Sequence, residues 1–258
     1  MMINQPYYML DFSASACMFD IRINDYPVLI LNVEGQVSTM LPINNAILES
    51  GEQNISARVM PVLGQHELDP NAELKFDIKL FDVANDFVFQ KQFNEYKSEP
   101  VNEKKIPALN YESVFWVDVP YKQDAWQNGQ KLTDNKKMRS ELEIAYNQIS
   151  DLIKSKNYDK FRQLLANREQ NIAKSMYLSE NEANARIDDL IEDFENGFNV
   201  MPLPNDAVMH IYAYGKVAAL KKLNGESALY LYSKKTQENL MLDISFYIPK
   251  GKNTFEVI

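Results

Sequence analysis

Polar and apolar residues alternate along most of the first 121 positions, the pattern of strands with one buried face. The clearest run is "ELKFDIKLFDV", in which Leu74, Phe76, Ile78 and Leu80 share one side. "NISARVMP" places Ile55, Ala57 and Val59 together in the same way. Turn-forming segments such as "ESGEQN" and "LDPNAE" separate these runs. The pattern predicts an N-terminal antiparallel β-sandwich in a domain over residues 1–130.

The segment "CMFDIRIN" predicts one arm of a hairpin within this domain. Cys17, Phe19, Ile21 and Ile23 alternate along it, and Asn24-Asp25 suits a tight turn into the strand "VLILNV". Cys17 therefore reads as a small buried apolar residue rather than a nucleophile.

Residues 138–198 follow a helical period instead. One apolar stripe recurs every three or four positions and consists of Leu142, Ala145, Tyr146, Ile149, Leu152 and Ile153. Ser179 and Glu182 have the spacing of a capping box, which marks the start of a further helix. The change of period near Thr133 predicts a second domain over residues 135–258.

Strand patterns return at residues 207–258. Asn224-Gly225 suits a two-residue type I′ turn, which would pair Val217 with Tyr232 and Ala219 with Tyr230. "NLMLDISFYIP" reads as a third strand and "NTFEVI" as a short last one. The second domain is thus expected to place helices before an antiparallel sheet, and the whole chain to be α+β.

The N-terminal part resembles the jelly-roll accessory domains attached to some glycoside hydrolases. The resemblance covers residues 17–61 and rests on "INDYPVLI" followed by "LESGEQNI", a Leu-x-x-Gly turn that leads into a strand with one extra residue before Asn54. It implies a β-sandwich, and many domains of that family are purely structural.

Residues 138–258 resemble the cystatin-like α+β cone of nuclear-transport-factor-like proteins. The order of elements carries this resemblance, because helices come first and a meander of strands ends the chain. It implies a curved sheet around a helix and a pocket. Catalytic members place an Asp/His or Asp/Tyr set there, for which this chain offers only His210 and its tyrosines.

The composition limits which partners, cofactors and catalytic residues are expected. The net charge of −9, with only short and scattered basic runs, argues against nucleic acid as a partner. Two His, one Cys and no nucleotide, zinc or nucleophile-elbow motif give no basis for a cofactor, a metal or a catalytic residue. No apolar run is long enough to span a membrane, and the first residues lack the pattern of a secretion signal, so we expect a cytoplasmic protein with no membrane partner.

Two groups of residues are candidates for binding. "FWVDVPYKQDAWQNG" holds Trp116, Asp118, Tyr121 and Trp126, which form either a packing element between the domains or an aromatic platform for a sugar ring or a partner's side chain. The second group is His210, Tyr212 and Tyr214, at alternate positions of one predicted strand.

Three functions remain open. The first hypothesis is a non-enzymatic protein-interaction protein, such as an acidic adaptor, inhibitor or immunity-type protein with a basic partner. The alternative is a carbohydrate- or small-ligand-binding protein that uses the sandwich or a C-terminal pocket. The second alternative is an enzyme with a pocket around His210.

Overall fold

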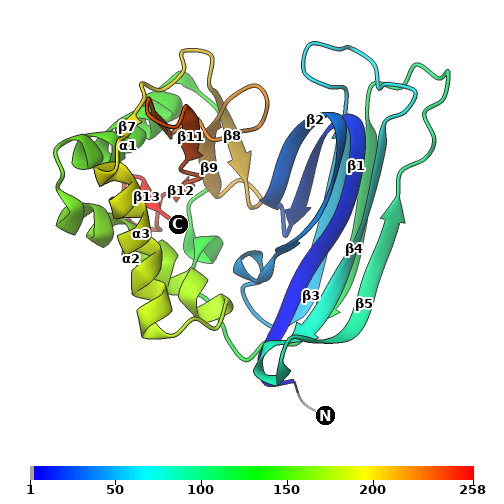
Figure 1. The fold of residues 1–258 in the computed structure, drawn as a ribbon, viewed down its shortest axis with the longest axis horizontal. Coiled ribbons are helices and arrows are strands. Elements are labelled where there is room, and N and C mark those ends of the chain that lie inside the picture. The colour runs from blue at the N-terminus through cyan, green and yellow to red at the C-terminus, as the bar shows by residue number, and fades with distance from the viewer. Residues whose placement is uncertain (1–2) are drawn as a thin grey trace. The chain divides into compact units, whose positions relative to one another are not determined.

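The computed structural model describes residues 3–258, and the chain divides into two compact units, Met1–Gln123 and Asp124–Ile258 (Figure 1). Among the described residues, the first unit is a curled antiparallel sheet, and the second combines α-helices with small antiparallel sheets. The expected α+β class, with strands first and helices before the last strands, is confirmed.

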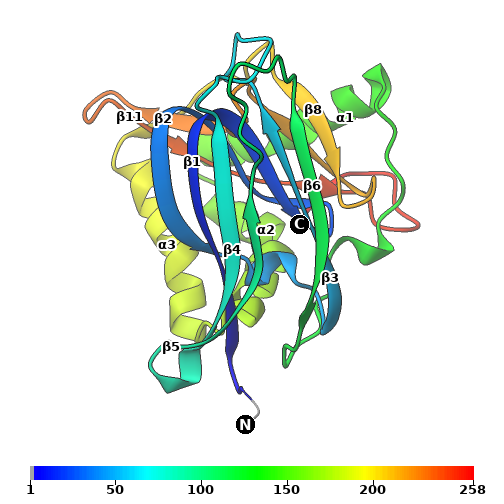
Figure 2. The ribbon, with the colours of Figure 1, turned by 90° about the vertical axis from the view of Figure 1, so that its right-hand side faces the viewer.

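One long strand organises the first unit. The strands are β1 (Pro6–Ile23), β2 (Tyr26–Pro42), β3 (Gly51–Met60), β4 (Glu73–Asp82), β5 (Val88–Lys97) and β6 (Leu109–Val117). β2 pairs with β1 over most of its length, while β4 pairs with residues 6–15 of β1 and β3 with residues 18–23. β5 continues the sheet from β4, and β6 continues it from β3 (Figure 2).

Ala16 divides β1 into two halves. It has a left-handed backbone with a φ of 46°, and the register with β2 shifts between Ser15 and Cys17. Buried apolar residues are even-numbered before this point and odd-numbered after it: Tyr8, Leu10, Phe12 and Ala14, then Cys17, Phe19, Ile21 and Ile23. An extra residue of this kind bends a strand. The apolar faces of the two halves therefore face each other, with the rings of Phe12 and Phe19 5.5 Å apart.

The expected buried faces of the N-terminal strands are confirmed. Ile55, Ala57 and Val59 are buried, as are Leu74, Phe76, Ile78 and Leu80. Asn24 and Asp25 form the turn between β1 and β2, both with positive φ. Cys17 is fully buried, and burial raises the pKa of its thiol to about 11, so the thiol is neutral at physiological pH.

The second unit surrounds one apolar core. Its helices are α1 (Lys136–Lys154), α2 (Tyr158–Ser175) and α3 (Glu180–Glu195). Its strands are β7 (Phe198–Val200), β8 (Val208–Tyr212), β9 (Val217–Lys221), β10 (Tyr230–Ser233), β11 (Glu238–Met241), β12 (Phe246–Tyr247) and β13 (Glu256–Val257). They form one sheet in the order β13-β12-β9-β8 and another in the order β11-β10-β7.

The helices begin and pack as their sequences predict. Ser179 and Glu182 form both hydrogen bonds of the capping box at the start of α3. Asn135 caps α1 by accepting a hydrogen bond from the Met138 amide at 2.9 Å. Within the predicted stripe of α1, Leu142, Ala145, Tyr146, Ile149 and Ile153 are buried against the core, and Leu152 is partly buried.

The expected pairing around Asn224-Gly225 is wrong in two respects. The turn is one residue longer than expected, and the strands on either side of it pair with other strands. The loop has three residues, because the Lys222 amide donates to the Glu226 carbonyl and Lys221 lies opposite Ser227. Beyond this short bridge the chain diverges, so that β9 pairs with β8 and β12, while β10 pairs with β7 and β11. A type I turn followed by a left-handed glycine gives this geometry, and Gly225 has a φ of 87°.

Gly225 is nevertheless required at its position. Gly225→Val should lower the free energy of unfolding by about 1–2 kcal/mol, because a β-branched residue is strained at positive φ. Urea denaturation of the variant and of the wild type measures the difference. Equal midpoints would contradict this assignment of the turn.

The last segment is also divided differently from expectation. "NLMLDISFYIP" forms β11 in one sheet and β12 in the other, although Leu242, Ile244, Phe246 and Ile248 are all buried as their alternation predicts. The short final strand is present as β13, which pairs with β12. Residues between the expected domains hydrogen-bond within the second unit: the Gln130 amide donates to Ile248, and the Leu132 amide donates to Gly215.

Candidate functional site

Trp116 lies on the outer side of β6, and Asp118 directly follows this strand. Trp116 is 69% exposed, whereas its neighbours Phe115 and Val117 are buried, as the alternation predicts. The Asp118 amide donates to the Tyr8 hydroxyl at 3.1 Å, and the Ser50 hydroxyl donates to the Asp118 carboxylate at 3.3 Å. The main chain of Asp118 is thus part of the fold, while the indole of Trp116 is presented to solvent.

Tyr121 and Trp126 are instead buried and contribute to the fold. Tyr121 is buried, and its hydroxyl donates to the Asn44 carbonyl at 3.1 Å. Trp126 is also buried and begins the short 3-10 helix η3 (Trp126–Asn128) in the second unit. The four candidates of this segment therefore do not form a shared platform, and Trp116 alone has an exposed ring.

The second predicted group lies on β8 and the turn after it. The rings of His210 and Tyr212 stack with centroids 5.8 Å apart, and Tyr212 is fully buried. Tyr214 is 55% exposed in the turn to β9, where Ala213 and Tyr214 both have positive φ. The Lys131 ammonium group donates to the Tyr214 carbonyl, which helps to hold this strained turn.

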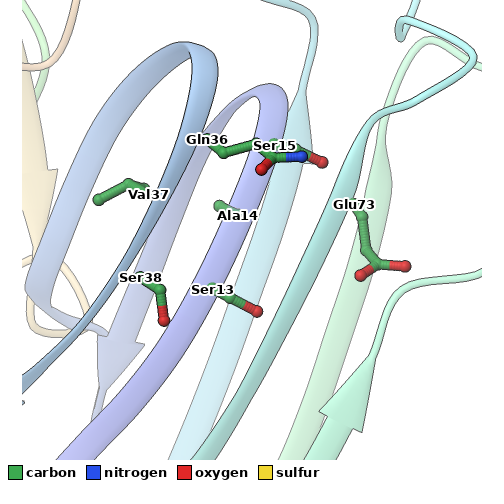
Figure 3. A pocket seen from close by; sticks show the side chains of 7 residues that line it. All are labelled: Ser13, Ala14, Ser15, Gln36, Val37, Ser38 and Glu73. Atoms are coloured by element: carbon green, nitrogen blue, oxygen red, sulfur yellow. The ribbon is translucent and has the colours of Figure 1, made fainter.

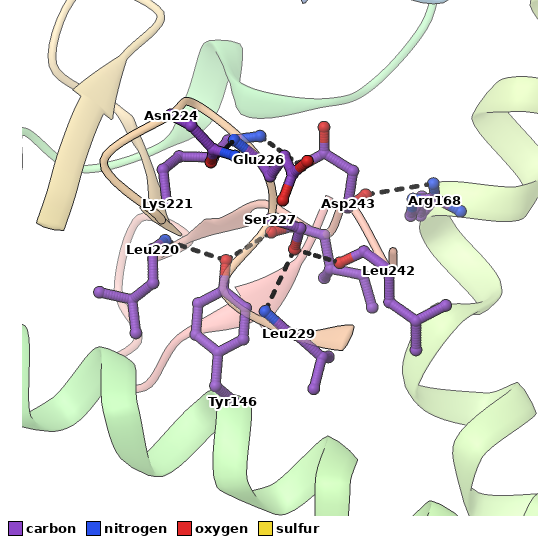
Figure 4. Close-up of polar contacts among 11 residues, drawn as sticks. Tyr146, Arg168, Leu220, Lys221, Asn224, Glu226, Ser227, Leu229, Leu242 and Asp243 are labelled. Atoms are coloured by element: carbon purple, nitrogen blue, oxygen red, sulfur yellow. Dashed lines mark hydrogen bonds and ion pairs between the residues drawn. The ribbon is translucent and has the colours of Figure 1, made fainter. Parts of the chain in front are cut away.

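A buried polar network lies near β9 (Figure 4). The Tyr146 hydroxyl donates to the Ile244 carbonyl at 2.7 Å and accepts from the Leu220 amide at 3.0 Å. The Ser227 hydroxyl donates to the Leu242 carbonyl at 2.7 Å. Lys221 is only 4% exposed, and its ammonium group lies 2.6 Å from the Asp243 carboxylate. The two hydroxyls satisfy main-chain groups and the buried ammonium group is paired, so these contacts have a structural role.

The sequence did not predict an exposed aromatic surface of the first unit. Tyr7, Phe81, Phe87 and Phe89 form an aromatic cluster on the outer side of β1, β4 and β5. Tyr7 lies opposite Phe81 across one strand pair, and Phe81 lies opposite Phe89 across the next. Phe87 contacts both Tyr7 and Phe81, with centroids 5.1 and 5.6 Å apart.

Two rings of the aromatic cluster face solvent to a large extent. Phe87 is 46% exposed, Phe89 52%, and the intervening Val88 45%. Phe87 also has a φ of 61°, a strained conformation for a bulky residue. The signal in the sequence is "DFVFQ", whose apolar residues occupy both faces of a strand, so that one face cannot be buried in the same core.

A polar hollow of about 460 Å³ lies elsewhere on the first unit, over β1, β3 and β6. The residues that line it include Asp20, Arg22, Ser56, Arg58, Asn110 and Glu112. Arg22 donates to Asp20 at 2.6 and 2.8 Å and to Asp25 at 2.8 Å. Although burial lowers the pKa of Arg22, its hydrogen bonds with the two carboxylates raise it by more, so the guanidinium stays charged.

A second, smaller hollow of about 290 Å³ lies beside the bend of β1 (Figure 3). Ser13, Ser15, Gln36 and Ser38 present hydroxyl and amide groups there, together with Glu73. Glu73 already forms an ion pair with Lys97 at 2.8 Å. These groups give the hollow polar character but no pair of groups suited to acid–base chemistry.

The two units differ strongly in charge. Residues 1–123 contain 17 acidic and 9 basic residues, a net charge of −8, whereas residues 124–258 contain 19 and 18, a net charge of −1. The net negative charge of the chain is therefore carried almost entirely by the unit that has the aromatic cluster.

Within residues 3–258, no three His, Cys, Asp or Glu side chains are placed to hold a metal ion together. The helices described there are too short or too polar to cross a lipid bilayer. The cytoplasmic location expected from the sequence stays a prediction. No family model matches the chain, and no curated protein or solved structure is significantly similar to it.

Proposed function

We propose that the protein is a non-enzymatic binding protein whose first unit docks a protein partner on the aromatic cluster. The observation that carries this proposal is the exposure of Phe87 and Phe89 at 46% and 52% within a group of four touching rings. Large contiguous apolar patches are uncommon on free protein surfaces and mark interaction sites. Aromatic anchors of this kind supply much of the free energy of protein–protein binding.

The strained backbone beside the cluster supports the same function. Asp86 and Phe87 both have positive φ, which costs a non-glycine residue roughly 1–2 kcal/mol. Phe87 keeps this conformation despite its cost, with its ring in contact with Tyr7 and Phe81. Side chains that are ordered before binding lose less entropy when the partner arrives.

The charge of the first unit supports a basic partner. The net charge of −8 on the first unit attracts a basic protein and repels a second copy of the same unit. Long-range attraction raises the association rate and fades as salt shortens the screening length from about 10 Å at 0.1 M to about 3 Å at 1 M. We therefore infer a basic partner with an apolar contact surface.

The test compares three versions of the protein as bait in a native lysate. Phe87→Ser/Phe89→Ser removes both exposed rings, and Met40→Ser is the matched control, since Met40 is a 42% exposed residue of β2 outside the cluster. A basic protein retained by wild type and control should bind the double variant at least about 30-fold more weakly, the loss of one or two anchors. Its affinity for the wild type should also fall as salt rises.

Thermal melting of all three versions checks that the fold is intact. Retention of the same proteins by wild type and double variant, with equal affinity, would refute the role of the cluster. The enzyme alternative has its own test: His210→Ala should leave the activity of the protein in cells unchanged, because the ring packs on Tyr212.

A further inference from the structure

Asp20 is among the residues that line the polar hollow over β1, β3 and β6, and it has one carboxylate oxygen without a partner. Arg22 binds Oδ2 through both Nε and Nη2, at 2.8 and 2.6 Å. Oδ1 is buried and accepts no hydrogen bond from any residue of the described chain, and Asp20 as a whole is 7% exposed. Buried oxygen atoms are nearly always satisfied in proteins, so this one requires an explanation.

Arg58 is the complementary group. It lies directly opposite Asp20 in the pairing of β1 with β3 and is exposed. Its guanidinium forms no ion pair with any residue between positions 3 and 258. Arg22, in contrast, is held by Asp20 and Asp25. The hollow thus combines an acceptor that lacks a donor with a charged donor that lacks an acceptor.

We propose that this hollow binds a saccharide. Hydroxyl groups donate and accept through the same atom, so adjacent hydroxyls of one sugar ring satisfy Asp20 Oδ1 and Arg58 together. Ser56, Asn110 and Glu112 line the same hollow and provide further donors and acceptors. A basic side chain would satisfy Asp20 but would be repelled by Arg58. An anion would be attracted by Arg58 but repelled by Asp20.

Trp116 extends the site along β6. Glu112, Val114 and Trp116 occupy alternate positions of this strand and so project to the same outer side. Four residues of strand place Trp116 about 13 Å from Glu112, beyond the reach of a single sugar ring in the hollow. The exposed indole and the half-exposed Val114 offer an apolar surface to the C–H faces of the next sugar residues. The site therefore suits a short oligosaccharide.

Binding includes a side-chain movement, because Oδ1 is covered in the free protein. Arg58 is the side chain placed to make it, since it is exposed and lies opposite Asp20. Exposed side chains change rotamer within nanoseconds, so this step does not slow binding.

Saturation-transfer NMR with glucose, galactose, N-acetylglucosamine, maltotriose, cellotriose and chitotriose tests the proposal. At least one trisaccharide should bind the wild type, and Arg58→Ala should weaken it by at least 10-fold without a change in melting temperature. Asp20→Asn should weaken binding similarly. Trp116→Ala should weaken the trisaccharide several-fold and leave the affinity of its single sugar unchanged.

Two variants outside the hollow are matched controls. Asp77→Asn alters another carboxylate with a buried oxygen, and Met40→Ala removes another exposed apolar side chain; both should bind saccharide as the wild type does. Absence of transfer to all six saccharides, or equal effects of Arg58→Ala and the controls, overturns the proposal. Perturbation of the hollow by hexa-arginine alone would assign it to a basic partner instead. Failure here leaves the function proposed for the aromatic cluster intact, because the two sites share no residue.

Discussion

Replacement of Tyr146 by Phe should lower the free energy of unfolding of the second unit by about 2–5 kcal/mol. The hydroxyl donates to the Ile244 carbonyl at 2.7 Å and accepts from the Leu220 amide at 3.0 Å, and Tyr146 is fully buried. Phe fills the same space but leaves both main-chain groups buried without a partner. Each such group costs about 1–3 kcal/mol. Tyr146 therefore connects α1 to β9 and to the segment between β11 and β12.

Urea denaturation followed by the helical circular dichroism signal measures this effect, since α1, α2 and α3 all belong to the second unit. Tyr158→Phe is the control, because Tyr158 is only partly buried at the edge of the same core. Its cost should stay below about 0.5 kcal/mol. A loss of less than 1 kcal/mol for Tyr146→Phe would show that other groups replace the hydroxyl.

Alternation in the sequence is a reliable guide to the faces of single strands in this protein. Ile55, Ala57 and Val59 are buried, and Trp116 is exposed, because a strand has only two sides. The curl of the sheet could not be predicted in the same way. It depends on a left-handed Ala16, and alanine carries no signal for that conformation.

The pairing of the C-terminal strands was harder to predict for a related reason. Asn224-Gly225 fits a two-residue turn and also the observed loop with a left-handed Gly225, and a one-residue difference changes the register. The hairpin of β8 and β9 was missed because its turn uses Ala213 and Tyr214 at positive φ. Strand partners depend on the rest of the unit, which a local pattern does not contain.

The two proposed binding surfaces also could not be predicted from local sequence patterns. Exposure of Trp116 follows from its alternation with Phe115 and Val117, but the polar hollow brings together Asp20, Arg58 and Glu112 from three strands. Their proximity depends on the order β1-β3-β6, which no motif in the sequence encodes. The aromatic cluster likewise requires that β1, β4 and β5 be neighbours.

Phe19→Ala should destabilise the first unit by about 3–5 kcal/mol and leave the second unit unchanged. Phe19 is fully buried and packs on Phe12 with centroids 5.5 Å apart, so truncation removes a large apolar side chain and leaves a cavity. Phe161→Ala should have the reverse effect, because Phe161 is fully buried in the helical core beside Phe194. Both expectations follow from the hypothesis that the two units have separate cores.

Hydrogen exchange read by mass spectrometry separates the two responses, because each peptide belongs to residues 1–123 or 124–258. In Phe19→Ala, peptides from β1, β3 and β4 should exchange faster, while those from α1 and β9 keep their wild-type rates. Limited proteolysis should then remove the weakened unit and leave the other intact. If either substitution accelerates exchange equally throughout both units, the chain unfolds as one cooperative body and the hypothesis of two cores is wrong.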